Sequence, residues 1–455
     1  MSTTPSRTSS TQKPRPRSIA YPYLGAAAAG AAGLIVERFG SARVLRHYQT
    51  SRLRALLHHA YETVPFYRLR FDQAGFHPNQ FRTLDDLQRV PLTRKADIRL
   101  ATDEEAVAND CDPSHLHRHT TGGSTGEPTK LRFTPYEDRL LRMFRLLATM
   151  RLGLRLRDRR TQLRTDQPFS SKIEEHFVLP SQILYAFLPP EDMRANLCQF
   201  RPDVIRGFPS ALASFADQIT DEDRLHLRPR FLTTDSETLT DLARERIEKA
   251  FKAPVFDIYD CYECNVIAYQ CTRSEGYHVM DPAVVVEVLN EDGPVEPGET
   301  GEVALTSLHA WAAPLIRYMP GDMVERGPNQ CACGAPTSTL AKVYGRTHDL
   351  FLLPNGRSLH PKYLAAPIRI IMPVLRQYQI AQEAIDRVVV KLQGVPGAEM
   401  PPEKLETIRK GMLRILGEGV TVLINVVDDI PSEPNGKFRP YRSYVVQGAG
   451  VQCPQ

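Results

Sequence analysis

Apolar residues recur every three to four positions in several stretches of this chain, which is the spacing of an α-helix. In the first of these stretches, Leu53, Leu56 and Ala60 fall on one helical face. The helix is expected to end at Val64, because the residue before Pro65 avoids the helical backbone conformation. The same pattern predicts helices at 41–63, 136–152 and 240–250.

Runs of consecutive apolar residues predict buried strands at 284–289, 301–308, 388–392 and 420–427. Helices and strands interleave through the first three quarters of the chain, which favours an α/β body. After Gly345-Arg346 the pattern changes to a small α+β unit. We therefore expect a tail at 1–40, a large N-terminal domain at 41–345 and a small, mobile C-terminal domain at 346–455.

Composition is that of an ordinary globular protein and excludes several functions. The 455 residues are 42% apolar and 24% charged, and the net charge of +4 with no sustained basic run does not indicate a nucleic-acid partner. Residues 1–36 contain no acidic residue, so a targeting segment and a disordered tail both stay open. The apolar run Leu24 to Val36 is too short and too rich in Gly and Ala for a membrane span. We expect a cytoplasmic protein, and its oligomeric state cannot be read from the sequence.

A segment rich in glycine and hydroxyl groups precedes the second predicted helix, at Thr121, Gly122, Gly123, Ser124, Thr125 and Gly126. Glycines let backbone N–H groups approach phosphate oxygens, hydroxyls add donors, and Lys130 adds charge. No Gly-Lys-Ser/Thr follows, so the segment is not a Walker A loop. It also spells Gly-x-Ser-x-Gly, but a nucleophile elbow needs a helix directly after the serine, and Glu127-Pro128 stands there instead.

Further segments form a series along the chain. They are Ala60 to Tyr67, Leu92 to Lys95, Ser236-Glu237-Thr238-Leu239, Tyr259 to Glu263, Pro297 to Glu302, Arg317 to Asp322, Gly345-Arg346 and Pro434 to Arg439. Each alone is an ordinary turn, strand end or helix start. In this order and spacing they resemble the motifs of the adenylate-forming (acyl-CoA synthetase) superfamily, over roughly 49–443. Within it, the chain looks most like the branch of phenylacetate–CoA ligases and capsule-biosynthesis adenylating enzymes.

The resemblance implies a two-step reaction and a role for each matching residue. An acid, expected to be aryl or arylacetic, would react with ATP to give an acyl-adenylate and pyrophosphate, and the acyl group would pass to coenzyme A. An amine, another small nucleophile or a carrier protein would be an alternative acceptor, and a homologue that only binds nucleotide would be a third possibility. Intact Glu263, Asp322 and Lys437 argue against that third possibility.

By this resemblance, Thr121 to Gly126 would hold the ATP phosphates, and Ser236, Glu237 and Thr238 would line the adenine site, with Tyr259 packed on adenine. Glu263 would bind Mg²⁺, which suits an oxygen ligand. Asp322 would accept hydrogen bonds from the ribose, and Arg346 would approach the ribose or phosphate. Lys437 would bridge the carboxylate and the α-phosphate.

Three positions depart from the family pattern. Asp260 stands where a glycine is usual after the tyrosine, and Tyr262 stands where threonine is frequent before the glutamate. His348 takes the place of an acidic hinge residue, with Asp349 next to it. The first two changes are expected to reshape the substrate pocket, and the third puts the usual hinge in question.

Clustered cysteines indicate a metal site. Cys331 and Cys333 form a tight pair, and Cys271 and His278 lie upstream, so the four supply a Cys₃His set that suits tetrahedral zinc. The resembled branch contains members with a similar cluster, and four protein ligands would make the zinc structural. We interpret Cys261 and Cys264 as packing residues. A second group, His115, His117 and His119, alternates just before the glycine-rich segment and would share one face of a strand, as a substrate-facing or solvated wall or as a metal site.

Overall fold

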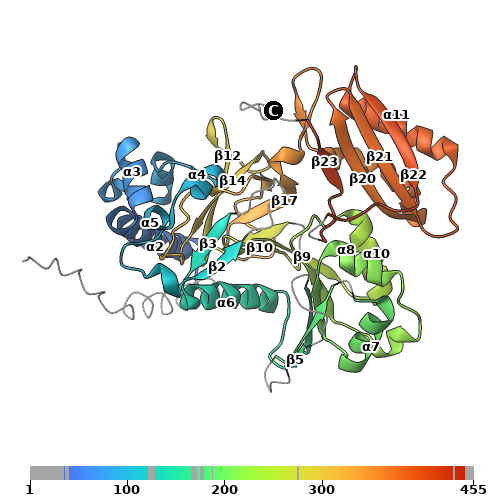
Figure 1. Ribbon diagram of the computed structural model, residues 1–455, viewed down its shortest axis with the longest axis horizontal. Helices are drawn as coiled ribbons and strands as arrows, with labels where there is room; N and C mark the ends of the chain where they lie inside the picture. The colour runs from blue at the N-terminus through green and yellow to red at the C-terminus, as the bar shows by residue number, and fades with distance from the viewer. Residues whose placement is uncertain are drawn as a thin grey trace, which may run out of the picture.

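The computed structural model describes residues 35, 40–120, 129–164, 172–174, 179–186, 188–273, 276–433 and 436–445. The expected phosphate loop, Thr121 to Gly126, and the acid-poor tail lie outside these residues. Figure 1 shows a large mixed body and a smaller lobe that carries the C-terminal part of the chain. No helix in the described ranges is long and apolar enough to cross a membrane.

The N-terminal helices form a layer at one end of the body (Figure 1). As the apolar spacing predicts, Leu53, Leu56 and Ala60 are buried in α2, and the helix ends at Val64. Pro65 then opens the next helix, where a missing N–H costs nothing. The elements are α2 (Ala42–Thr63), α3 (Pro65–Gln73), η1 (Pro78–Gln80), η2 (Leu84–Arg89), α4 (Lys95–Leu100), α5 (Asp103–Ala106) and η3 (Pro113–His115).

A long sheet runs through the body in the order β1-β15-β14-β16-β17-β11-β10-β9-β8-β7-β4-β6-β5. One half is mainly parallel, and helices cover it, because parallel strands are buried on both faces. This half consists of β4 (Arg160–Arg164), β5 (Lys172–Glu174), β6 (Ser181–Tyr185), α7 (Pro190–Phe200), β7 (Val204–Gly207), α8 (Pro209–Ala216), α9 (Asp223–His226), β8 (Phe231–Thr234), α10 (Asp241–Phe251) and β9 (Val255–Cys261).

The other half of the sheet is mainly antiparallel and contains both strands expected between 284 and 308. Its strands are β1 (Thr93–Arg94), β10 (Asn265–Gln270), β11 (Tyr277–Val279), β12 (Val284–Asn290), β13 (Gly293–Pro294), β14 (Thr300–Ser307), β15 (Tyr318–Met319), β16 (Asp322–Arg326) and β17 (Thr339–Arg346). The two halves meet where β9 pairs with β10, and both predicted site residues Tyr259 and Glu263 lie at this junction.

A separate hairpin of β2 (His117–Thr120) and β3 (Lys130–Phe133) brackets the glycine-rich segment. It leads into α6 (Pro135–Arg151), whose N-terminus is capped by Thr134 through its hydroxyl and by Glu137 through its carboxylate. The alternation expected for three histidines holds for His117 and His119 only. His115 ends η3 instead, because Pro113 after the capping Asp112 starts a helical turn there.

The smaller lobe has a four-stranded sheet in the order β22-β21-β20-β23, with η5 and α11 packed on it (Figure 1). The predicted strands at 388–392 and 420–427 appear here as β21 and β22. Lys437 lies in the connection between β22 and β23. The elements after β17 are η4 (Thr347–Asp349), β18 (Phe351–Leu352), β19 (Ser358–Leu359), η5 (Pro361–Val374), β20 (Leu375–Ala384), β21 (Arg387–Gly394), α11 (Pro402–Leu416), β22 (Thr421–Val427) and β23 (Tyr441–Ser443). The predicted α/β class, with a large N-terminal and a small C-terminal domain, is confirmed.

Candidate functional site

Three of the predicted site residues meet at the ends of β9, β16 and β17. Asp322 and Arg346 are partners in the register between β16 and β17, and Arg346 Nε lies 3.2 Å from Asp322 Oδ1. Tyr259, on β9, donates its hydroxyl to Asp322 Oδ2 at 2.7 Å. The Asp322 carboxylate raises the pKa of Arg346 against the effect of burial, so the guanidinium stays charged. The group is a buried carboxylate held by one phenol and one cation.

Glu263 lies close to this group, in the turn after β9. Its Oε1 accepts the hydroxyl of Tyr318 at 2.8 Å, and the glutamate is buried. Lys95, at the start of α4, is close enough that Glu263 and Arg346 both influence it; burial lowers the pKa of Lys95 and Glu263 opposes that shift. In the sequence, Lys95 ends the motif segment Leu92 to Lys95, but no role is predicted for it there. Lys95 directly follows a short strand and begins a helix, and this position is the local signal that could have indicated a functional role.

The segment Ser236 to Thr238 lies between this group and the small lobe. Gly345 has a φ of +114°, and a Cβ there would stand 3.5 Å from the hydroxyl oxygen of Thr238, so the two segments are in contact. Ser236 also has a left-handed backbone, with φ of 67°. Its carbonyl accepts a hydrogen bond from Lys437 Nζ at 3.4 Å, across 201 positions of sequence. Lys437 is therefore brought to the predicted adenine segment by the small lobe.

Glu237 takes a position that the sequence did not indicate. Its carboxylate turns toward the start of α8 and the Lys437 segment rather than lying free. Ser210 donates to it through N–H at 3.0 Å and through its hydroxyl at 2.9 Å, and Phe438 N–H donates at 2.9 Å. Burial raises the pKa of Glu237, and these donors oppose that shift. The residue thus joins the two domains.

The departures from the family pattern have different surroundings. Asp260 is ion-paired with Arg145, from α6, and accepts the N–H of Ser236 at 3.2 Å. Tyr262 is 57% exposed. Asp349 pairs with Arg439, which is two residues after Lys437, and burial raises the pKa of Asp349 to about 6 while Arg439 opposes the shift. An acidic group next to the expected hinge position therefore contacts the segment that carries Lys437.

A cavity of about 460 Å³ opens between the two domains beside this segment. Its walls come from α8 and α10 on one side and from β20, β21 and the residues around Phe438 on the other, with Glu237 and Thr238 among them. The volume lies in the range of small-molecule sites. A small molecule therefore has room next to the Lys437 segment.

The four predicted metal ligands come together. The ligand atoms of Cys271, His278, Cys331 and Cys333 all lie within 4.8 Å of one another. Cys331 Sγ is 3.8 Å from Cys271 Sγ, and Cys333 Sγ is 3.3 Å from His278 Nε2. The other ring nitrogen, Nδ1, is 2.9 Å from Thr337 Oγ1, which orients the imidazole toward the sulfurs. This donor set and its burial fit zinc.

Cys261 and Cys264 stay outside this cluster and pack with Tyr259 in an apolar core, as interpreted from the sequence. A second group of possible ligands joins His117 and His119 to Asp138 on α6. Arg142 already binds both carboxylate oxygens of Asp138, at 3.3 and 2.9 Å. The guanidinium of Arg142 therefore supplies the positive charge that a metal ion would otherwise bring to Asp138.

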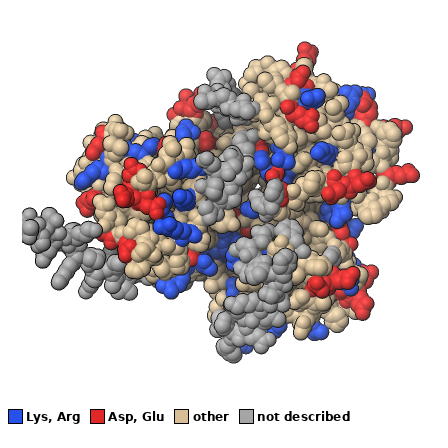
Figure 2. All heavy atoms as spheres, in the orientation of Figure 1, with Lys and Arg blue, Asp and Glu red and all other residues tan. Residues whose placement is uncertain are grey.

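Basic side chains gather on one face of the molecule near the candidate site. Figure 2 shows Lys and Arg over α4 and the β2–β3 hairpin, to the left of the centre of this face. Lys95 and Arg99 belong to α4, and Lys130 belongs to β3, which follows the glycine-rich segment. A positive field of this kind attracts a polyanion and raises its local concentration.

Comparison with known proteins agrees with this geometry. The model of the CapK C-terminal domain matches residues 351–443. A phenylacetate-coenzyme A ligase of Thermus thermophilus is 26% identical over 87% of this chain and 95% of its own length. Protein CapK of Staphylococcus aureus is 26% identical over 54% of this chain and 53% of its own.

Solved structures show the same fold. A 2-hydroxyisobutyryl-CoA ligase in the postadenylation state matches with a TM-score of 0.70 at 20% identity, over 87% of this chain and 88% of that one. The same ligase in its thioesterification state matches with a TM-score of only 0.55, at 21% identity over 88% and 89% of the two chains. In sequence the chain is similar to phenylacetate-coenzyme A ligases and to protein CapK, and in fold it is similar to adenylate-forming CoA ligases.

Proposed function

We propose that this protein is an ATP-dependent ligase that activates a carboxylic acid as its acyl-adenylate, releases pyrophosphate and transfers the acyl group to coenzyme A. The observation that carries the proposal is the contact of Lys437 with Ser236 above the Tyr259–Asp322–Arg346 group. The relatives named above suggest an aryl or arylacetic acid as the substrate.

The first step needs charge neutralisation more than covalent help. An anionic carboxylate must approach a triphosphate, so positioned cations dominate the catalysis. Lys437 would neutralise the carboxylate and the α-phosphate, and Arg346 the phosphate or ribose side. Lys95 would add a third positive charge toward the departing pyrophosphate, a role that the sequence alone does not predict. The glycine-rich segment, Thr121 to Gly126, is proposed to hold the phosphates.

The remaining groups would position the nucleotide. Asp322 would accept hydrogen bonds from the ribose, while Tyr259, held by that carboxylate, would pack on adenine together with the backbone of Ser236 to Thr238. Glu263 would hold Mg²⁺, and its buried carboxylate oxygens suit a hard cation. The ion, when bound, would screen the phosphate charges. The Cys₃His cluster would hold zinc in a structural role, since four protein ligands leave no open position.

The second step requires Lys437 to leave, so that coenzyme A can reach the adenylate. Rotation of the small domain away from the body would serve this purpose. Lys437→Ala is therefore expected to abolish pyrophosphate exchange and to retain acyl transfer from preformed adenylate. Lys410→Ala is the matched control, because Lys410 is an exposed lysine of the same domain that pairs with Glu406.

The assay should screen carboxylic acids for pyrophosphate exchange and for sustained turnover with coenzyme A, amines or a carrier protein. Sustained turnover with coenzyme A supports the proposal. Turnover only with an amine or a carrier protein would show that coenzyme A is not the acceptor, while the proposed adenylation step would stand. Normal exchange in Lys437→Ala would contradict the assignment of that residue.

A further inference from the structure

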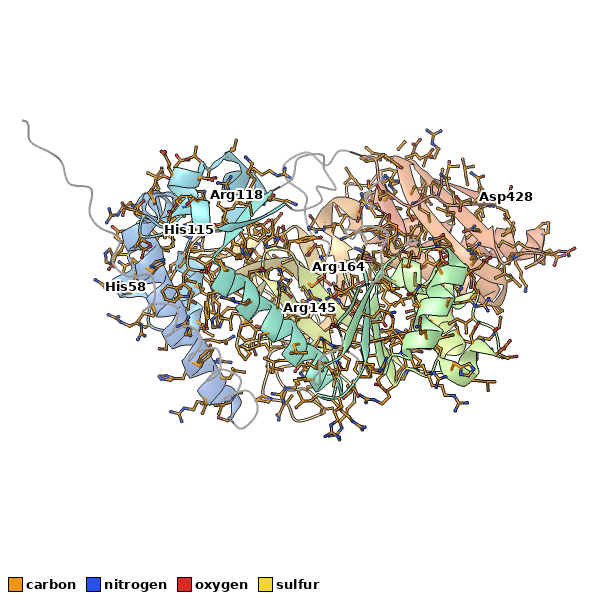
Figure 3. All side chains as sticks on the ribbon, turned by 60° about the horizontal axis from the view of Figure 1, so that its bottom comes forward. His58, His115, Arg118, Arg145, Arg164 and Asp428 are labelled. Atoms are coloured by element: carbon orange, nitrogen blue, oxygen red, sulfur yellow. The ribbon has the colours of Figure 1, made fainter. Side chains whose placement is uncertain are left out.

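A buried network of charges lies under the Lys437 site. It consists of Arg145, Arg206, Asp235 and Asp260, and is called the charged floor below. Arg145 pairs with both carboxylates, and Arg206 pairs with Asp235 through Nε. The two carboxylates are only 5% and 10% exposed. Figure 3 places Arg145 near the middle of the molecule, on α6.

The charged floor is tied to the residue that Lys437 contacts. Ser236 N–H donates to Asp260 at 3.2 Å, and the Ser236 hydroxyl donates to Asp235 at 3.1 Å. The Ser236 carbonyl accepts from Lys437. Phe208, two residues after Arg206, lies 5.8 Å from Lys437 Nζ. If Lys437 binds the substrate carboxylate, the acid therefore lies beside Phe208, and Ser236 connects this place to the charged floor.

The two arginines differ in what they can still bind. Arg145 uses its Nε on Asn265 at 2.8 Å and its two terminal nitrogens on Asp235 and Asp260. Arg206 uses only Nε, and its terminal nitrogens have no hydrogen-bond partner within the described part of the chain. Its side chain is 28% exposed, and Asp260 and Tyr262 are close enough to interact with its charge. The terminal donors are held in place because Asp235 fixes Nε.

The surrounding charge favours an acceptor at this point. Arg160 lies close enough to Arg206 for the two to repel, since burial and then Arg206 lower the pKa of Arg160. Arg206 therefore has a second positive charge beside it, from Arg160. An apolar group placed against Arg206 would remove water from N–H donors without replacing its hydrogen bonds, which is costly.

We propose that Arg206 is a specificity-determining residue, and that the acid substrate carries a second oxygen acceptor, a hydroxyl, carbonyl or carboxylate, which its terminal N–H groups bind. The inference rests on the proposed function and narrows its substrate class. Unsubstituted phenylacetate is then a poor substrate. Asp260, in place of the usual glycine, is a positioning residue, because it holds Arg145 and the backbone of Ser236.

The test compares acids in pairs that differ by one oxygen function: phenylacetate with 4-hydroxyphenylacetate, benzoate with 3-hydroxybenzoate, and butanoate with succinate. The oxygen-bearing member of at least one pair should give about 10- to 100-fold higher kcat/KM in pyrophosphate exchange, since a site that hydrogen-bonds a substrate oxygen discriminates strongly against its absence. Arg206→Met should bring that ratio near one, and Arg206→Lys should keep part of it. The ratio within one preparation does not depend on the folded fraction.

Arg228→Met is the matched control, because Arg228 is an exposed arginine that bonds only to the Arg224 carbonyl in the described residues. It should keep the wild-type ratio. Equal exchange for both members of every pair, or an unchanged ratio in Arg206→Met, would overturn the inference and leave the proposed function standing. If no acid supports exchange, the proposed function itself fails and the inference falls with it.

Discussion

Glu237 joins the two domains, and replacing its carboxylate with an amide tests whether the observed domain arrangement is the one that adenylates. Oε1 accepts hydrogen bonds from the Ser210 hydroxyl and from Phe438 N–H, both at 2.9 Å, and Oε2 accepts from Ser210 N–H at 3.0 Å. Glu237→Gln keeps the shape but leaves one acceptor oxygen. At least one buried N–H then loses its partner.

The size of the effect follows from these contacts. A hydrogen bond to a charged acceptor contributes about 1.5–3 kcal/mol, and a neutral acceptor gives roughly half of that. The variant should weaken the contact between Phe438 and the large domain by about 1–3 kcal/mol. At about 1.4 kcal/mol per factor of ten, the arrangement that brings Lys437 to Ser236 becomes roughly 5- to 150-fold less populated.

Pyrophosphate exchange at saturating ATP measures this arrangement, because it requires Lys437 in place. Exchange should fall by up to that factor in Glu237→Gln, while acyl transfer from preformed adenylate is retained. Asp241→Asn is the control: its partner Arg369 also crosses between the domains, but the two side chains are 67% and 62% exposed, and such pairs contribute little. Unchanged exchange in Glu237→Gln, or equal loss of both half-reactions in a folded variant, would refute the reasoning.

Two further predictions concern the metal cluster and the hinge region. Cys271→Ser should lower the zinc content from about one ion per chain and reduce the melting temperature, measured by metal analysis and calorimetry, since four ligands are needed to close the site; full zinc content in the variant would remove the assignment. Burial raises the pKa of Asp349 from 3.8 to about 6, with Arg439 opposing, so its stabilising contribution is complete below pH 4 and is lost as pH rises through 6. In urea unfolding, the free energy of unfolding of Asp349→Asn should therefore rise by up to about 3 kcal/mol relative to that of the wild type between pH 4 and pH 7. A difference in unfolding free energy that stays constant across this range would contradict the assigned environment.

Local pattern was enough for much of the fold. The helix from Ala42 to Thr63 and the strands β12, β14, β21 and β22 follow from apolar spacing and from proline, because these signals act within a few residues. The three-histidine strand was wrong at its first member. There Asp112 caps a helical turn that Pro113 begins, and this turn outweighed the alternation of histidines. Both the turn and the alternation are local signals.

By itself, the sequence determined the order of the motifs, the resemblance to the adenylate-forming superfamily and the set of cysteines that share a cluster, because residue identity and spacing carry that information. Only the tertiary structure decided that Glu237 binds Phe438, that Asp260 holds Arg145, and that Lys95 lies near Glu263. These contacts join segments far apart in the chain, as Lys437 and Ser236 are 201 positions apart. Their partners depend on the register of the whole sheet and on how the two domains pack, and neither is encoded in a local pattern.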